Sequence, residues 1–247
     1  MNHRALAALL PDLPRWVELR GELLEGHAEV IGLTVDPLAF VVVAPAFGSV
    51  QVVGCPPVEA IGEAAGLAGP RLSILVTAES RGWVAAALPE LIEERAILHL
   101  LGPDARLPDV AAGAVRHLLP GEVTALTHLP AETREELIAV DAVGAPIAAA
   151  LEADTPVAFC YAGAVTESLW DISIESLTTW RRRGFAAKAV AFEVERLRAS
   201  GQLPVWGAVE SNAASLGLAA KLGFVPTDEV WVFSAPAVPA ELGSRPR

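Results

Sequence analysis

The segment that decides the fold is WRRRGFA, residues 180–186. It lies between LWDISIESL at 169–177, whose alternation predicts a strand, and a helical pattern over 186–200. A helix that starts after a glycine presents free backbone N–H groups and a positive dipole end, and both favour phosphate oxygens. Gly184 leaves room for a pyrophosphate, and the arginines before it add positive charge. The segment therefore predicts an anion-binding loop, although a solvated basic turn would show the same pattern.

A second motif, NAASLGLAAKLGF, occupies residues 212–224, one predicted strand further on. It predicts a helix that Ser211 or Asn212 caps and that ends at Gly223. Taken alone, this pattern is equally that of an ordinary capped helix.

Together, the two motifs resemble the GNAT superfamily of acyl-coenzyme A-dependent N-acetyltransferases. The family pattern is a strand, a Q/R-x-x-G-x-G/A loop, a helix, a strand, and then N-x-x-(S/A)-x-x-L-(Y/A)-x-K-L-G-F. This chain carries RRRGFA at 181–186 and the second motif about 30 residues later. The resemblance is specific over residues 155–235 and extends from about residue 110. It does not cover the first hundred residues.

The resemblance implies an α/β (α+β) fold with a mixed, mostly antiparallel sheet that splays and is flanked by helices. We expect an N-terminal α+β domain at 1–105, accessory or degenerate, a GNAT acyl-coenzyme A-binding catalytic domain at 106–235, and a C-terminal tail at 236–247. The segment LGPDARLPD, residues 101–109, is the candidate linker. The N-terminal domain could shape the acceptor pocket, mediate a homodimer or cap the sheet, and the sequence does not rank these roles.

The hydrophobic pattern predicts the remaining elements. Strands are expected at 28–34, 40–44, 49–53, 71–77, 96–101, 114–118, 156–161, 204–210 and 224–234. Helices are expected at 57–67, 87–94 and 131–151, the last broken near Pro146. A turn is expected at Ala162-Gly163, and no internal repeat stands out. The uncharged stretch 37–58 is interrupted by prolines and glycines, which predicts a buried strand pair rather than a membrane span.

The resemblance also implies the residues that hold the coenzyme. The thioester would lie in the splay between the strands at 169–177 and 204–210. The backbone of three strand residues would line the pantetheine arm: Ile174, Glu175 and Ser176. The loop would hold the pyrophosphate through Arg181, Arg182, Arg183, Gly184, Phe185, Ala186, Ala187 and Lys188. Asn212 and Ser215 would contact the far side of the arm.

Acetylation of an amine requires a base, because a free ammonium group has a pKa near 10. Glu175 is the first candidate, since the resemblance places it next to the thioester, and Asp171 shares its strand face. Glu210 and Glu167 are further candidates, and each could instead be a surface carboxylate. Many GNAT enzymes carry a tyrosine acid where this chain has Ala219, so Ser215 or water is expected to serve instead.

The composition of the chain indicates which partners, compartment and cofactors to expect. The 247 residues carry a formal charge of −12, which disfavours nucleic acid and suits an amine or cationic substrate. Two cysteines form no disulfide framework and predict a cytoplasmic protein. The five histidines have no paired metal spacing, so no metal is expected.

The predicted reaction moves an acetyl group from acetyl-coenzyme A (acetyl-CoA) directly to an amine of an unidentified small-molecule or peptide acceptor. The alternatives are a non-catalytic acyl-CoA sensor and an acyltransferase that uses a longer acyl-CoA.

Overall fold

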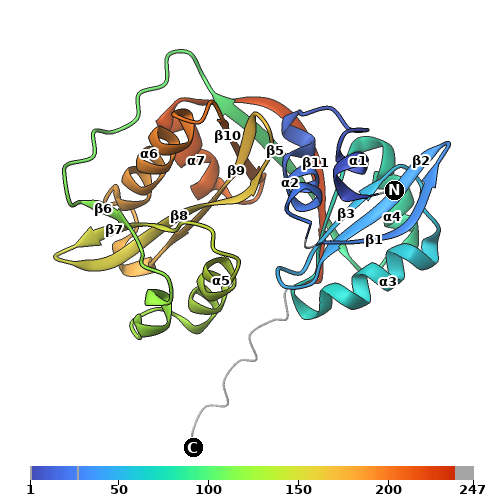
Figure 1. Ribbon diagram of the computed structural model, residues 1–247, viewed down its shortest axis with the longest axis horizontal. Coiled ribbons are helices and arrows are strands. Elements are labelled where there is room, and N and C mark those ends of the chain that lie inside the picture. Colours follow the sequence, from blue (N-terminus) through green and yellow to red (C-terminus); the bar gives the residue numbers. More distant parts are fainter. Residues whose placement is uncertain (1, 27, 237–247) are drawn as a thin grey trace, which may run out of the picture.

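A computed structural model describes residues 2–26 and 28–236. Within them, eleven strands form one continuous sheet in the order β1-β2-β3-β4-β11-β5-β10-β9-β8-β7-β6, and helices cover both faces (Figure 1). The strands are β1 (Glu29–Val35), β2 (Leu38–Ala44), β3 (Ser49–Val53), β4 (Ser73–Val76), β5 (Ile92–Leu101), β6 (Val115–His117), β7 (Ala148–Glu152), β8 (Thr155–Val165), β9 (Leu169–Ser176), β10 (Leu203–Val209) and β11 (Phe224–Ser234). The helices are α1 (His3–Ala7), α2 (Val17–Glu25), α3 (Val58–Ala68), α4 (Ala78–Ala87), α5 (Ala131–Ala142), α6 (Phe185–Arg198) and α7 (Ala213–Leu222).

Side-chain alternation along β8 and β9 builds two cores, one on each face of the sheet. Cys160 and Trp170 are fully buried in the core under α6 and α7. Phe159 and Tyr161 point the other way, into the core that includes α5 residues such as Leu137. Period-two alternation thus separates the face of the sheet under α6 and α7 from the face under α5.

The chain contains a repeat at the level of topology, although no repeat stands out in its sequence. In the first half, β1, β2 and β3 are antiparallel neighbours, α3 crosses over, and β4 pairs parallel to β3. In the second half, β7, β8 and β9 repeat that arrangement, α6 crosses over, and β10 pairs parallel to β9. A helix and a final strand complete each half, α4 with β5 and α7 with β11. The repeat is invisible in the sequence because a fold constrains patterning rather than residue identity.

The two halves exchange their last strands. β11 lies between β4 and β5, and β5 lies between β10 and β11. Figure 1 shows β5 and β11 at the centre, with β1–β4 on one side and β6–β10 on the other. The proposed division near residue 105 separates the halves along the chain, while the sheet runs continuously across them.

Three predicted elements differ from the structure. The helix expected at 87–94 does not form: α4 ends at Ala87 before Leu88-Pro89, and strand β5 begins at Ile92. The helix expected at 131–151 with a break near Pro146 stops at Ala142. Its expected second part is a strand, because Ala148–Ala150 lie fully buried in β7 and tertiary packing overrides the helix propensity of alanine. The turn expected at Ala162-Gly163 does not form, because β8 continues to Val165.

Other predictions are confirmed. The stretch 37–58 contains the buried hairpin β2–β3, and 102–114 between β5 and β6 has no regular structure. The helices α1 and α2 in the first 25 residues were not predicted. The predicted tail falls outside the described residues except for Pro236. Among the residues described, we find no helix with the length and apolar character needed to cross a bilayer.

Candidate active site

The sheet opens between β9 and β10. These parallel strands pair at only three positions, the last being Val205 with Asp171. Beyond that point β9 continues to Ser176 paired with β8, while β10 continues paired with β5. The two strands therefore diverge into a V-shaped opening, one side of which is the backbone of residues 172–176.

The start of α6 lies just beyond the open end of this V. Gly184 is its N-cap with φ +87°, and no side chain caps the helix. The first helical hydrogen bond runs from the N–H of Lys188 to the carbonyl of Gly184 at 3.1 Å. The N–H groups of residues 185–187 consequently have no partner within the helix, and a Cβ at Gly184 would meet nothing within 4 Å. This geometry suits an anion at the helix dipole.

Two arginines of the basic loop before α6 are held by hydrogen bonds and by a stacking contact. The Nε of Arg181 donates to the carbonyl of Ser176 at 3.2 Å. Arg183 donates to Glu152 at 2.6 Å and stacks over Trp180 at 4.6 Å from the ring centroid. Arg182 is exposed, with φ +63°. The loop therefore presents its positive charge in an ordered arrangement.

The start of α7 borders the opening on the β10 side. The Oδ1 of Asn212 accepts a hydrogen bond from the N–H of Ser215 at 3.1 Å, so Asn212 caps the helix. The hydroxyl of Ser215 accepts one from Nε1 of the buried Trp206 on β10 at 2.9 Å. Ala219, where many GNAT enzymes have a tyrosine, is completely buried.

The predicted base residues divide into two groups. Glu210 pairs with Arg95 at 3.0 Å and Glu167 with Arg20 at 2.5 Å, and both carboxylates are exposed. Asp171 and Glu175 lie on the face of β9 opposite α6. Burial raises the pKa of Glu175 to about 7, with a further contribution from Glu136.

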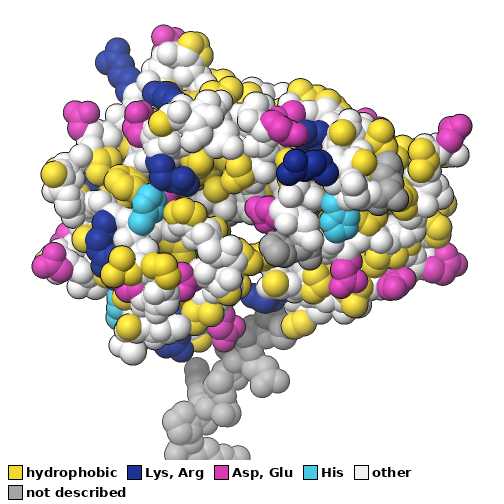
Figure 2. Space-filling model, in the orientation of Figure 1, with side chains coloured by type: hydrophobic (Ala, Val, Ile, Leu, Met, Phe, Trp, Pro, Cys, Tyr) yellow, Lys and Arg dark blue, Asp and Glu magenta, His cyan; other side chains and the backbone are white. Residues whose placement is uncertain are grey.

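On the same face, Gly163 of β8 leaves room for polar side chains of β9. A Cβ built on Gly163 of β8 would lie 2.8 Å from the Oγ of Ser173 and 3.0 Å from the Oδ2 of Asp171. The two polar groups therefore meet over this glycine, which is itself exposed. In the space-filling view the surface is hollowed at the middle of the molecule, between α5 and α2, with an acidic side chain on the rim (Figure 2).

Two helices bring carboxylates to this face that sequence reasoning missed. Glu136 of α5 accepts a hydrogen bond from the hydroxyl of Tyr161. Burial, followed by Glu136, raises the pKa of Tyr161. Glu18 and Glu22 come from α2, which packs against β8 and β9. Their spacing of four residues places both on one face of α2, but no sequence signal indicates that this face meets β9.

A sheet that splays between parallel strands beside a glycine-led helix start defines the GNAT class of fold. Residues 147–233 match the family model described as GNAT acetyltransferase. The chain therefore carries a GNAT acetyltransferase domain over those residues.

Solved structures match over nearly the whole chain. A GCN5-related N-acetyltransferase-like protein from Streptococcus suis has 13% sequence identity and a TM-score of 0.69, with 94% of this chain and 97% of that chain covered. A GCN5-related N-acetyltransferase from Kribbella flavida has 14% identity and a TM-score of 0.58, with 94% and 96% covered. A tandem GNAT protein from the clavulanic acid biosynthesis pathway has 15% identity and a TM-score of 0.55, with 97% and 94% covered. A comparison with curated proteins finds no match. At these identities the likeness shows the fold alone.

Proposed function

We propose that this protein is an N-acetyltransferase that moves an acetyl group from acetyl-CoA directly to the amine of a small-molecule or peptide acceptor. The observation that carries the proposal is the splay of β9 from β10 beside an uncapped helix start. The splay accommodates an extended coenzyme arm between the strands. The uncapped start of α6 offers backbone N–H groups to a pyrophosphate.

The residues present fit such a coenzyme. The N–H groups at the start of α6, with Arg181–Arg183 and Lys188, would hold the pyrophosphate. The unpaired edge of β9 at Ile174–Ser176 would line the arm, and Asn212 and Ser215 would face it from α7. Five residues of β9 span about 17 Å. An arm that starts at the loop therefore brings its thioester to the closed end of the V, near Ser173 and Asp171.

Asp171 becomes the first candidate for the base on this geometry, with Glu175 the second. Burial raises the pKa of both carboxyls, so each can accept a proton from an ammonium group near neutral pH. An N–H on the open edge of β9 would polarise the thioester carbonyl. The departing thiolate, with a reference pKa of about 8.5, needs little assistance from an acid.

The proposal is tested by thiol release from acetyl-CoA against a panel of amines. Release should depend on the amine, and Asp171→Asn should lower kcat at neutral pH by about 100-fold or more, as loss of a general base does. Glu175→Gln, measured in parallel, decides between the two carboxylates. Glu63→Gln, on the exposed face of α3, removes the same charge away from the site and should leave the rate unchanged.

A non-catalytic acyl-CoA sensor is the second candidate function. It is favoured by the burial of Ala219 and by the engagement of the single tyrosine hydroxyl with Glu136. Tight coenzyme binding without thiol release from any amine would support the sensor. Thermal shifts with longer acyl-CoA thioesters that exceed those with acetyl-CoA would instead indicate a longer acyl donor.

The proposed location is the cytoplasm. Cys55 is exposed and Cys160 is buried, and both are free thiols, as a reducing compartment would leave them.

A further inference from the structure

A cavity of about 470 Å³, here called the α6 cavity, lies between α6 and the irregular segment 102–114. In Figure 1 this segment, in green, runs from β5 around α6 to β6. The volume lies within the range of about 300–1,000 Å³ that small-molecule sites occupy. The described residues that line the cavity do not include those of loop 180–188 or of the start of α7, so it is separate from the candidate coenzyme site.

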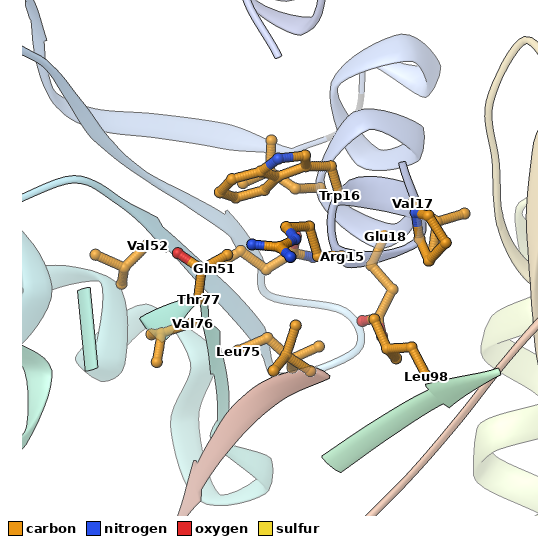
Figure 3. Close-up of a pocket in the computed structure, with 13 residues that line it drawn as sticks. Arg15, Trp16, Val17, Glu18, Gln51, Val52, Leu75, Val76, Thr77 and Leu98 are labelled. Carbon is orange, nitrogen blue, oxygen red and sulfur yellow. The ribbon is translucent and has the colours of Figure 1, made fainter. Parts of the chain in front are cut away.

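A second cavity, between the start of α2 and strands β3, β4 and β5, does not offer such room. Trp16, Gln51 and Thr77 are among the residues that line it (Figure 3). Its volume is about 20 Å³, which is enough for a single water molecule. It is therefore too small for an organic ligand, whereas the α6 cavity is large enough.

The walls of the α6 cavity are largely apolar. Leu107, Pro108 and Val110 line it from the connecting segment, and Phe192 lines it from α6. Leu107, Val110 and Phe192 also pack against the buried core under α6, so these walls have fixed positions. Such walls favour the hydrocarbon part of a ligand, because contact removes apolar surface from water on both sides.

Two basic side chains of the α6 cavity are held by one buried carboxylate. Nε2 of His117 lies 2.6 Å from Oε1 of Glu193, and Nε of Arg196 donates to Oε2 at 2.6 Å. A carboxylate only accepts, so Nε2 of His117 carries the hydrogen. Glu193 is completely buried, whereas the side chains of His117 and Arg196 are 33% and 34% exposed. A carboxylate is costly to bury unless it is paired, and Glu193 therefore fixes both basic side chains at the cavity wall.

This arrangement leaves the outer end of the Arg196 guanidinium available. Its Nε is engaged by Glu193, and among the described residues neither of its Nη groups has a hydrogen-bond partner. Parallel N–H donors in one plane match the two oxygens of a carboxylate. The ring of His117 makes a T-shaped contact with Phe192, with centroids 5.1 Å apart. The polar groups and the apolar wall of the cavity therefore adjoin.

Two carboxylates also border the α6 cavity, but they lie in solvent. Asp109 and Glu195 are exposed, and Glu195 pairs with Arg198 at 3.2 Å. Water screens exposed charges, so these two carboxylates repel a bound anion only weakly. The guanidinium of Arg196, which is anchored from behind, is then the group that decides the charge of the ligand.

We propose that the α6 cavity is a second binding site, which takes a small carboxylic acid with an apolar body. The carboxylate would accept hydrogen bonds from the Nη groups of Arg196, and the hydrocarbon part would lie against Val110 and Phe192. Such a ligand would bridge the connecting segment and α6. Its binding does not depend on the acetyl transfer proposed above.

The experiment measures the affinity of the full-length protein for acetate, hexanoate, octanoate and phenylacetate by calorimetry. The uncharged match of octanoate is 1-octanol. Octanoate should bind about tenfold or more tightly than acetate, which lacks the apolar body, and than 1-octanol, which lacks the carboxylate. It should also shift the ring signals of His117 in ¹H–¹⁵N NMR spectra. Saturating coenzyme A should leave its affinity unchanged.

The variants test the guanidinium. Arg196→Gln should weaken octanoate binding about tenfold or more, because the carboxylate loses its charged donors. Arg198→Gln removes the same charge two residues further along the chain, from a side chain outside the cavity, and should leave the affinity unchanged. If Arg196→Gln does not fold, Arg196→Lys keeps a charged partner for Glu193 without the guanidinium fork, and it should weaken binding about fivefold.

Several results would overturn the proposal. If none of the four acids binds saturably, the cavity takes no carboxylic acid of this kind. Equal affinity for octanoate and 1-octanol, or equal affinity of the unaltered protein and the folded Arg196 variants, would show that the carboxylate is not recognised. Displacement of octanoate by coenzyme A, or unchanged His117 signals, would place the acid elsewhere.

Discussion

At the scale of single residues, two side chains proposed to contact the coenzyme also stabilise the protein itself. Ser215 and Asn212 resemble coenzyme contacts by their place in the second motif. In the structure, Ser215 also accepts the indole N–H of a buried tryptophan, and Asn212 caps the helix that carries it. A change in binding at either position therefore has to be separated from a change in stability.

Ser215→Ala should lower the free energy of unfolding by about 1.5 kcal/mol, because the Nε1–H of Trp206 loses its acceptor inside the core. Urea denaturation of the free protein measures this loss. Ser211→Ala, at an exposed position before the helix, is the control and should leave the midpoint unchanged. Equal stability of the two variants would show that the indole finds another partner.

At the scale of elements, the starts of α6 and α3 differ although they occupy equivalent places in the repeat. Helix α6 follows a basic loop and a glycine. Helix α3 follows Pro56-Pro57, and its first turn carries Glu59. Proline supplies no N–H and the glutamate repels phosphate, so the α3 start is unsuited to an anion. Strands β3 and β4 also stay paired through Val52 and Val76, without the divergence of β9 and β10.

Gly184→Glu should weaken coenzyme A binding roughly 100-fold, or about 2.7 kcal/mol, by placing bulk and negative charge beside the phosphates. Isothermal titration calorimetry measures the affinity. Gly201→Glu is a matched control at the other end of α6, with φ +81° against +87° and no atom within 4 Å of its Cβ in either case. Equal affinity in both folded variants would contradict the loop assignment.

At the scale of the whole molecule, the strand exchange makes each half incomplete without the other. A fragment of residues 106–247 would lack β5 and expose the edges of β10 and β11. Unpaired edges of central strands favour aggregation.

We therefore expect residues 106–247 alone to be insoluble or unfolded. Co-expression with residues 1–105 should restore a soluble protein that binds coenzyme A. Soluble yield and circular dichroism measure the first result, and calorimetry the second. A folded, coenzyme-binding fragment 106–247 would show that β5 is dispensable.

The sequence predicted the second half well and the first half less completely. The alternation and caps around β9, α6 and α7 are local signals, so their bounds were close to those of the structure. The burial of Ala148–Ala150 in a strand depends on distant partners, and no local pattern indicates it. The carboxylates of α2 were missed for the same reason, because the packing of α2 against β8 and β9 depends on residues far along the chain. The repeat was missed because the halves share connections rather than residues.

The reciprocal insertion of β5 and β11 has a consequence during synthesis. A nascent chain that has left the ribosome as far as β5 cannot finish its first half, because the place between β4 and β5 belongs to the strand translated last. The edges of β4 and β5 that pair with β11 therefore stay unpaired until more than a hundred further residues have been synthesised. Emergence of β11 from the ribosome, rather than translation of the first half, is then the event that allows the sheet to be completed.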